Sequence, residues 1–238
     1  MLSPSHASHP SHPLWHLENI DVTHLLCPTK LGNEDLMARH THCRFKKGEA
    51  VYVPQDLSDR IFFITEGRIK ISVMNEEGKE ITKAILGRGE VFGELAVLGE
   101  ERRHDFATAL EDTDTCVVTL DELRGLMRDR SELNLFFMKI FGGRQLEMER
   151  RLESLVFRDS RSRIVEFLVN ITKAKGQRVG YEWVLRKPVT HQEIANLTAT
   201  SRQTVTTTLN DLRYKKLLTF NRSRLLIRDL EKLAEEMK

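Results

Sequence analysis

The sequence predicts an α+β fold in which an antiparallel β-roll is followed by one long helix and then by a winged helix-turn-helix unit. Residues 44–120 contain short apolar runs separated by glycine-containing turns, which is typical of an antiparallel roll or barrel. Residues 131–157 place apolar side chains at helical spacing. Residues 158–238 contain two short capped helices followed by a basic hairpin, the pattern of a winged helix-turn-helix.

These patterns divide the chain into four segments. Residues 1–14 are rich in His, Pro and Ser, and we expect this tail to be disordered because it has almost nothing to bury. Its prolines disfavour the helix that would align its histidines, so no metal site is expected there. Residues 15–130 form the β-rich domain, which begins with short helices. Residues 131–157 form the long helix, and residues 158–238 form the winged unit.

Period-two alternation and glycine punctuation define the strands of the roll. Val51 and Val53 flank a tyrosine, and residues 69–73 alternate apolar with polar side chains. Further short apolar runs occupy residues 61–64, 84–86, 91–92, 106–109 and 116–120. Because turns containing glycine separate these runs about every ten residues, the region is expected to close into a jelly roll.

A long amphipathic seam follows the roll. Its members are spaced alternately by three and four residues, which is the a/d pattern of a coiled coil: Met138, Phe141, Gln145, Met148, Leu152 and Leu155. A seam of this length has no partner within the roll, so we expect it to pair with a second copy of the chain in a homodimer. The alternative is that part of the helix packs on its own β-roll.

The winged unit is defined by its helix caps. Thr190 and Glu193 have the spacing of a capping box, and Ser201 offers a second cap after a short connection. Ala199 stands in that connection where glycine is usual, because the turn needs a positive φ, so we expect a strained or slightly different turn. The basic loop 221–224 between two short apolar runs predicts the wing, and Asp229 caps a last helix.

Charge is distributed unevenly along the chain. The net charge is +2, but residues 1–157 carry 20 Lys and Arg against 26 Asp and Glu, which is −6, whereas residues 158–238 carry 17 against 9, which is +8. A basic helix-turn-helix unit indicates binding to double-stranded DNA. Arg202 and Gln203 have forked groups that suit guanine and adenine in the major groove. Five further residues are expected to neutralise phosphates: Arg213, Lys215, Lys216, Arg222 and Arg224.

The composition disfavours several other classes of protein. No run of roughly eighteen apolar residues occurs, so no membrane span is expected. The N-terminus lacks the basic start and apolar run of a secretion signal, which favours a cytoplasmic location. No nucleophile and base or metal-ligand motif indicates an enzyme. Cys27, Cys43 and Cys116 include no CxxC pair, so neither a disulfide framework nor a thiolate zinc site is expected.

Five motifs in order resemble those of the Crp/Fnr superfamily (cyclic AMP receptor protein and fumarate-nitrate regulator) from about residue 15 to the end. They are FKKGE at 45–49, FITEG at 63–67, LGRGEVFGEL at 86–95, THQEIA at 190–195 and SRQTV at 201–205. The resemblance implies a bacterial, homodimeric transcription regulator that binds a palindromic operator, with a cyclic-nucleotide-binding-type roll. Family analogy alone places a contact with RNA polymerase on the loop 173–187.

The resemblance also implies roles for individual residues of the winged unit. Thr190 and Gln192 match phosphate contacts, and the wing adds Arg222 and Arg224. The recognition-helix contacts match Ser201, Arg202, Gln203, Thr204 and Thr207. The cyclic AMP receptor protein has Glu and Arg at the positions of Gln203 and Thr207. We therefore expect a half-site that shares a guanine contact with that protein but differs from its TGTGA.

The effector site departs from the family pattern. Cyclic-nucleotide binders use a Gly-Glu-Leu turn followed by an Arg-Ser pair on the phosphate. This chain keeps Gly93, Glu94, Leu95 and Arg103, but His104 replaces the serine and Asp105 follows it. The Thr-Ser pair that meets adenine falls on Met148 and Glu149. Phosphate recognition needs donors and positive charge, so a response to cyclic AMP is not expected, and the ligand is another one or none.

Alternative functions stay open at this point. One is a regulator that responds to a cyclic nucleotide, haem or redox state, and another is a nucleotide-responsive, protein-binding scaffold. Cys116 and residues 103–107 resemble the fumarate-nitrate branch, but its cluster needs four cysteines, so no iron-sulfur cluster is expected. A haem ligand would come from His16, His24, His40 or His104.

Overall fold

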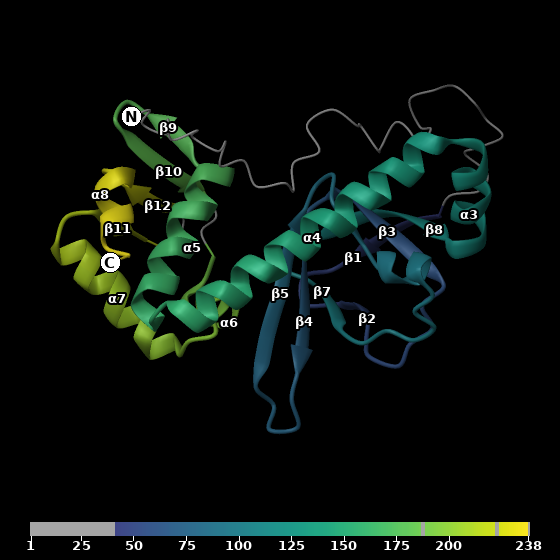
Figure 1. Ribbon diagram of the computed structural model, residues 1–238, viewed down its shortest axis with the longest axis horizontal. Coiled ribbons are helices and arrows are strands. Elements are labelled where there is room, and N and C mark those ends of the chain that lie inside the picture. The colour runs from purple at the N-terminus through teal and green to yellow at the C-terminus, as the bar shows by residue number, and fades with distance from the viewer. Residues whose placement is uncertain (1–40, 187–188, 222–223, 238) are drawn as a thin grey trace, which may run out of the picture.

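The computed structural model describes residues 41–186, 189–221 and 224–237 (Figure 1). Within these residues the predicted α+β fold is confirmed: a β-roll, a long helix and a winged helix-turn-helix unit follow one another along the chain. The predicted tail over 1–14 and the short helices before residue 40 lie outside the described residues. So do Cys27, Arg222 and three of the four histidines considered as haem ligands, His16, His24 and His40.

Two antiparallel sheets of four strands each form the roll. One sheet has the order β1 (Thr41–Phe45), β8 (Thr113–Thr119), β3 (Arg60–Glu66) and β6 (Val91–Phe92). The other has the order β2 (Ala50–Tyr52), β7 (Phe106–Ala109), β4 (Arg68–Met74) and β5 (Glu80–Gly87). Apolar side chains from both sheets pack into one core, since alternate residues of each strand face inward: Ile64, Ile69, Leu86, Phe92 and Ala107 are among them.

The turn between β3 and β4 requires glycine. Gly67 has φ +89°, and a Cβ on it would lie 2.4 Å from the Thr113 Oγ1. A side chain at this position would therefore be strained and would also collide with β8. This steric requirement explains why the sequence has a glycine at position 67, where it marks a turn.

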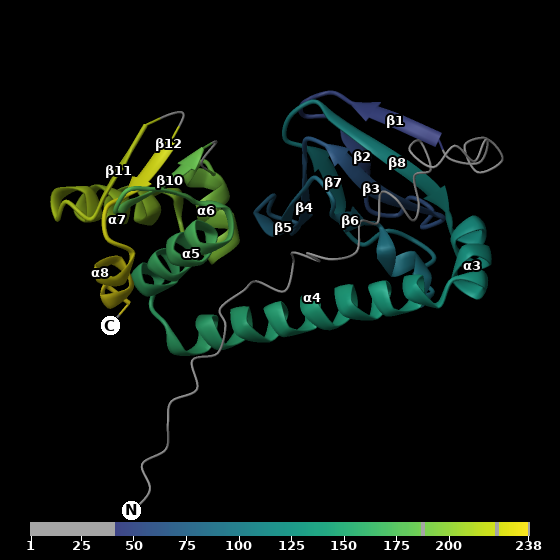
Figure 2. The same cartoon turned by 90° about the horizontal axis from the view of Figure 1, so that it is seen from above.

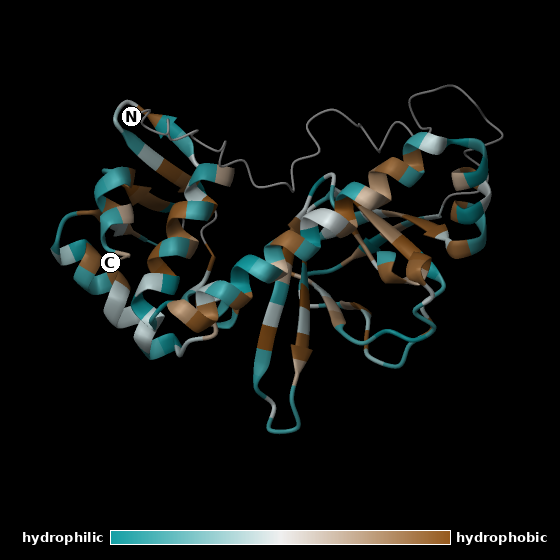
Figure 3. Ribbon diagram, in the orientation of Figure 1, coloured by the Kyte–Doolittle hydropathy of each residue, from teal (hydrophilic) through white to brown (hydrophobic). Residues whose placement is uncertain are grey.

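The helix α3 (Leu120–Asp129) leads from the roll into α4 (Ser131–Phe157). The first half of α4 packs on the roll, where Leu133, Phe136 and Phe137 are buried in a second core with β3 and β8 residues. The second half continues past β5 toward the winged unit (Figure 2). Figure 3 shows that hydrophobic residues recur along the length of α4, including the part beyond the roll. The alternative expectation is therefore confirmed for the first half of α4, which packs on the roll, whereas apolar residues of the second half are exposed and their pairing with a second copy stays a prediction.

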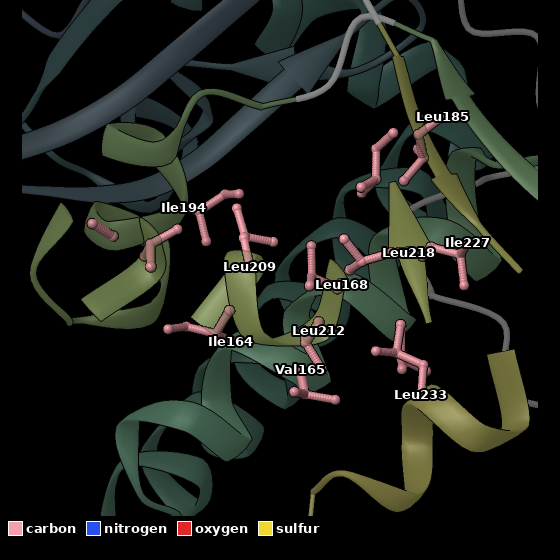
Figure 4. Packing of buried hydrophobic residues seen from close by; sticks show 14 residues of the cluster. Ile164, Val165, Leu168, Leu185, Ile194, Leu209, Leu212, Leu218, Ile227 and Leu233 are labelled. Carbon is pink, nitrogen blue, oxygen red and sulfur yellow. The ribbon is translucent and has the colours of Figure 1, made fainter. Parts of the chain in front are cut away.

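Over its described residues, the winged unit contains four helices and a four-stranded sheet. The helices are α5 (Ser160–Lys175), α6 (His191–Thr198), α7 (Arg202–Tyr214) and α8 (Leu230–Glu235). The sheet has the order β11 (Leu218–Phe220), β12 (Arg224–Ile227), β10 (Glu182–Arg186) and β9 (Gln177–Val179). Its core draws on every one of these helices, as Figure 4 shows with Leu168, Ile194, Leu212 and Leu233.

Three strands were not expected from the sequence. β1 consists of Thr41 to Phe45 and begins before the predicted roll, and β9 and β10 lie in the stretch expected to be the loop 173–187. All three residues of β9 are exposed, so no alternation of apolar and polar side chains marks it. Its conformation comes from pairing with β10, which the local sequence does not encode.

Candidate nucleic-acid interface and effector site

Side-chain caps at the start of both helices fix the helix-turn-helix, and the first of these caps is reciprocal. The Thr190 hydroxyl accepts from the Glu193 amide, while the Glu193 carboxylate accepts from the Thr190 amide at 2.6 Å, which confirms the predicted capping box. Ser201 caps α7 by accepting from the Thr204 amide at 3.0 Å. Between the two helices Ala199 has φ 50°, the left-handed conformation that the sequence led us to expect at a turn lacking glycine.

The predicted base-reading side chains share one exposed surface at the start of α7. Ser201, Arg202, Gln203 and Thr207 are exposed, and Thr204 is half-buried because its amide and hydroxyl meet Ser201. The opposite face of α7 is buried through Val205, Leu209 and Leu212, as the helical spacing predicts. The helix therefore presents forked and short polar groups outward on a rigid support. That arrangement suits a helix that enters the major groove.

The residues expected to contact phosphates at the edges of this surface differ in whether another residue of the chain already engages them. Gln192 on α6 is exposed, as are Arg213 and Lys216 at the end of α7 and Arg224 on the wing strand β12. The Lys215 Nζ lies 2.7 Å from the Glu236 carboxylate. An acidic residue that follows α8, distant in sequence, thus engages Lys215, which the local sequence did not reveal.

His191 joins α6 to α7 and to the wing, a role that motif reasoning missed. Its Nδ1 lies 3.0 Å from the Thr206 hydroxyl, and its ring meets the Phe220 ring edge-on at 5.5 Å. Burial, with a contribution from the Arg202 charge, lowers the pKa of His191 below its ordinary value, so the neutral imidazole prevails at neutral pH. The Arg213 guanidinium in turn lies 5.4 Å from the centre of the Phe220 ring.

In the effector site, Arg103 binds groups of its own chain. Arg103 is 2% exposed, its Nη1 donates to the Gly93 carbonyl at 2.9 Å, and its Nη2 donates to the Arg60 carbonyl. The guanidinium also lies 4.6 Å from the centre of the Tyr52 ring and 3.6 Å from the Glu100 carboxylate. The donors that would receive an anionic phosphate therefore bind backbone carbonyls and an internal carboxylate.

The carboxylate of Asp105 is a second internal anion at this site. Asp105 is buried, and its carboxylate lies 2.8 Å from the Lys83 Nζ of β5. It also accepts a hydrogen bond from the Tyr52 hydroxyl. Burial, followed by the charge of Asp105, raises the pKa of Tyr52 far above its ordinary value, so this hydroxyl remains a donor.

Glu94, the acidic residue of the Gly-Glu-Leu turn, pairs with Arg144 of α4. Arg144 also donates to the Val91 carbonyl at 2.6 Å. Burial lowers the pKa of Arg144 to about 10, which still leaves the side chain charged at neutral pH. The turn is thus attached to the central helix by a charge-assisted contact within one protomer.

The structure brings together only part of the predicted effector set. Gly93, Glu94 and Arg103 lie in one cluster, with Leu95 half-buried beside them. His104 has a side chain that is 71% exposed, and Met148 is 66% exposed. Glu149 is exposed and accepts from Gln145 at 3.0 Å. In this arrangement the guanidinium of Arg103 is engaged internally, and Asp105 places negative charge beside it.

The predicted seam is largely exposed along α4. Met138, Met148, Leu152 and Leu155 are all exposed, Phe141 is half-buried, and Gln145 is exposed. Apolar side chains of this size gain free energy when they leave water, so a row of them on one helix indicates a surface that is covered in the assembled protein.

Two features are absent from the part of the chain that the structure describes. There, no group of three or more His, Cys, Asp or Glu side chains is arranged to hold a metal ion. None of the helices within the same ranges combines the length and hydropathy needed to cross a membrane.

Comparison with known proteins gives a consistent result over both domains. A cyclic nucleotide-binding domain family model matches residues 42–130, and a Crp-like helix-turn-helix domain model matches residues 162–236. The chain is 30% identical to the global nitrogen regulator of Synechococcus elongatus over 77% of its length and 84% of that relative. It is 27% identical to a CRP-like cAMP-activated global transcriptional regulator of Mycobacterium tuberculosis, over 80% of this chain and 85% of that one.

A solved structure resembles the whole arrangement. A variant of CooA from Carboxydothermus hydrogenoformans superposes with a TM-score of 0.77 at 28% identity, covering 90% of this chain and 95% of the other. The two domains and the helix between them are therefore shared features.

Proposed function

Since this chain belongs to the Crp/Fnr family of DNA-binding transcription regulators, we propose that a homodimer of it reads a palindromic operator with the exposed start of α7. The observation that carries the proposal is the shared exposed surface of Ser201, Arg202, Gln203 and Thr207, fixed by the caps of both helices. Arg202 is assigned to a guanine and Gln203 to a neighbouring base, because their forked groups match those base edges. Thr190, Gln192 and Arg224 are assigned to phosphates, as is Arg222.

The second copy is assigned to the exposed seam of α4. Regulators with this helix-turn-helix bind DNA as dimers. Pairing of Met148, Leu152 and Leu155 with their copies would bury side chains that are otherwise exposed. A two-fold axis along this seam would place the two recognition helices in successive major grooves, with half-sites roughly one helical turn apart.

We propose in addition that operator binding needs no cyclic nucleotide. The support is that the charged residues of the effector site bind groups of their own chain: Arg103 binds backbone carbonyls, Asp105 binds Lys83 and Tyr52, and Glu94 binds Arg144. Cyclic AMP would have to displace Glu100 from Arg103 and also lie beside Asp105, which costs electrostatic free energy at a buried site.

Where the protein acts follows from its target. Operator binding requires the compartment that holds the chromosome, which we assign as the cytoplasm.

A contact with RNA polymerase, required of an activator, is assigned to the β9–β10 hairpin, where Val179 and Tyr181 are exposed. We propose no enzymatic activity, since relatives over most of the chain are transcription regulators.

The test is a selection of bound duplexes from a random library by purified protein with no added nucleotide. We expect a palindrome with one guanine in common with TGTGA but a different half-site. Arg202→Ala should lower affinity by about 1–3 kcal/mol and relax one base position. Arg178→Ala, an exposed arginine on β9 outside the helix-turn-helix, is the matched control and should leave the selected sequence unchanged. An unaltered TGTGA palindrome, or an Arg202→Ala protein with the same base preference, would contradict the assignment.

Calorimetry tests the effector statement separately. Titration of the protein with cyclic AMP and with cyclic GMP should give no binding heat, and neither nucleotide should change operator affinity. Saturable binding of either nucleotide that raises operator affinity would show that the internal contacts of Arg103 and Asp105 yield to a ligand.

A further inference from the structure

Strand β5 of the effector domain lies against α6, the first helix of the helix-turn-helix (Figures 1 and 2). The polar contact between them is a hydrogen bond from the Asn196 Nδ2 to the Glu80 Oε2 at 3.2 Å. Glu80 opens β5, and Asn196 is on the second turn of α6. Residues 116 positions apart in sequence are thereby connected across the two domains.

Each end of this hydrogen bond is supported by its own domain. On the roll, the Lys70 Nζ of β4 lies 2.5 Å from the Glu80 carboxylate. Burial would raise the pKa of Glu80, but hydrogen bonds from Lys70 and Ser72 lower it overall, so the acceptor is ionised at neutral pH. On α6, the Asn196 Oδ1 accepts from the Gln192 Nε2 at 2.8 Å. The contact therefore reaches Gln192, which the proposed function assigns to a DNA phosphate.

The same strand reaches the effector site through a β-bulge three residues later. Ser72 pairs with Thr82 and Ile71 pairs with Ala84, so Lys83 is the extra residue of β5. A bulge changes the direction of the side chain at that point. The Lys83 ammonium meets Asp105 at 2.8 Å, while its carbonyl accepts from the Arg151 Nη1 of α4 at 2.5 Å. Strand β5 thus contacts Asp105 of the effector site, the central helix α4 and the helix-turn-helix.

We propose that Glu80 and Asn196 are positioning residues through which the effector domain holds α6, and with it the DNA-reading surface, in the orientation that binds the operator. The direction follows from exposure: in this arrangement the start of α7 and Gln192 are open to solvent. The Glu80 to Asn196 contact therefore stabilises an arrangement in which those groups are accessible. Loss of the contact lowers operator affinity by releasing α6 from β5.

The polarity of the hydrogen bond allows a test by exchange of its partners. Asn196→Asp sets a carboxylate against that of Glu80 and should lower affinity for the selected duplex about fivefold or more. Glu80→Gln alone should have a smaller effect, because its amide oxygen still accepts from Asn196. The double variant, Glu80→Gln with Asn196→Asp, keeps the net charge and restores a hydrogen bond with donor and acceptor exchanged. It should recover affinity to within about twofold of the wild-type protein.

Glu76→Gln is the matched control, because Glu76 is an exposed residue at the tip of the same β4–β5 hairpin. Combined with Asn196→Asp, it removes the same charge but should not restore affinity. If Glu76→Gln restores operator affinity as well as Glu80→Gln does, the effect is due to long-range charge and not to the contact. If the Asn196→Asp protein keeps the operator affinity of the wild type, the proposal is overturned. Glu80→Ala changes no residue of the winged unit, and it must also weaken operator binding for the proposal to stand. If the Asn196→Asp protein does not fold, Glu80→Ala serves as the test in its place.

Hydrogen exchange in the absence of DNA gives a readout that does not depend on the operator. Amides of α6 and of the start of β5 should exchange faster in the Asn196→Asp protein and return to wild-type rates in the double variant. If the wild-type protein selects no duplex at all, the proposed function fails, whereas unchanged exchange in Asn196→Asp refutes the contact itself.

Discussion

Replacement of Leu152 by alanine tests the dimer seam most directly. The Leu152 side chain is 62% exposed in the single protomer, at the centre of the exposed half of α4. Complete burial of a leucine side chain contributes about 1.5–3 kcal/mol, so burial of the exposed part against a second copy contributes about 1–2 kcal/mol per protomer. A symmetric dimer contains two such side chains, which gives about 2–4 kcal/mol, or roughly 30- to 1000-fold in the dimer dissociation constant.

Sedimentation equilibrium measures this constant over a range of protein concentrations. Leu57→Ala is the matched control, since Leu57 is 65% exposed but lies in the roll between β2 and β3 rather than on α4. It should leave the dimer constant unchanged. Equal weakening by both substitutions would show that general exposure of apolar area drives association. An unchanged constant in the Leu152→Ala protein would show that the seam is not the dimer interface.

Three further predictions concern stability and salt dependence. Ala199→Gly should raise the free energy of unfolding by about 0.5–1 kcal/mol, because glycine adopts the left-handed φ of 50° without strain. Ala174→Gly within α5 is the control and should lower the free energy of unfolding by a similar amount. Thermal denaturation measures both. Hydrogen bonds from Lys215 and then Arg161 hold the pKa of Glu236 below its ordinary 4.5, so its contribution to stability is present above that pH and is lost as the pH falls through the folded-state pKa. The Glu236→Gln protein should therefore be less stable than wild type at pH 7, and the difference should shrink as the pH falls below 4.5 and the Glu236 carboxylate is protonated. A difference in stability that is independent of pH would contradict this reasoning. Arg224→Ala should weaken operator binding similarly for all sequences and reduce the slope of log affinity against log salt by about one, whereas a change in base preference would instead assign Arg224 to a base.

The pattern of hydrophobic residues and caps predicted most of the fold. Thr190 and Glu193 identify the start of α6 because a capping box is satisfied by residues three positions apart. Val205, Leu209 and Leu212 identify the buried face of α7 for the same local reason, namely the helical repeat. Strand β9 gave no such signal, because its exposed residues are ordered only by pairing with β10.

The sequence predicted which residue types stand in the effector site but not which partners they bind. The sequence shows that Asp105 stands beside Arg103, and charge alone then argues against an anionic ligand. It does not show that Arg103 donates to Gly93 and Arg60, or that the bulge at Lys83 brings an ammonium to Asp105. Those partners come from different strands, and no local spacing relates them.

The sequence by itself determined the order of the two domains, the period of each helix, the caps and the residues that face solvent at the start of α7. Each of these is set by neighbours within a few positions along the chain, so a local pattern is sufficient to encode it. Only the tertiary structure decided that Lys215 is engaged by Glu236, that His191 joins three elements, and that Glu80 meets Asn196 across the domains. Such contacts depend on how distant segments pack, because hydrogen bonds and ion pairs form only when folding brings both partners within about 3–4 Å.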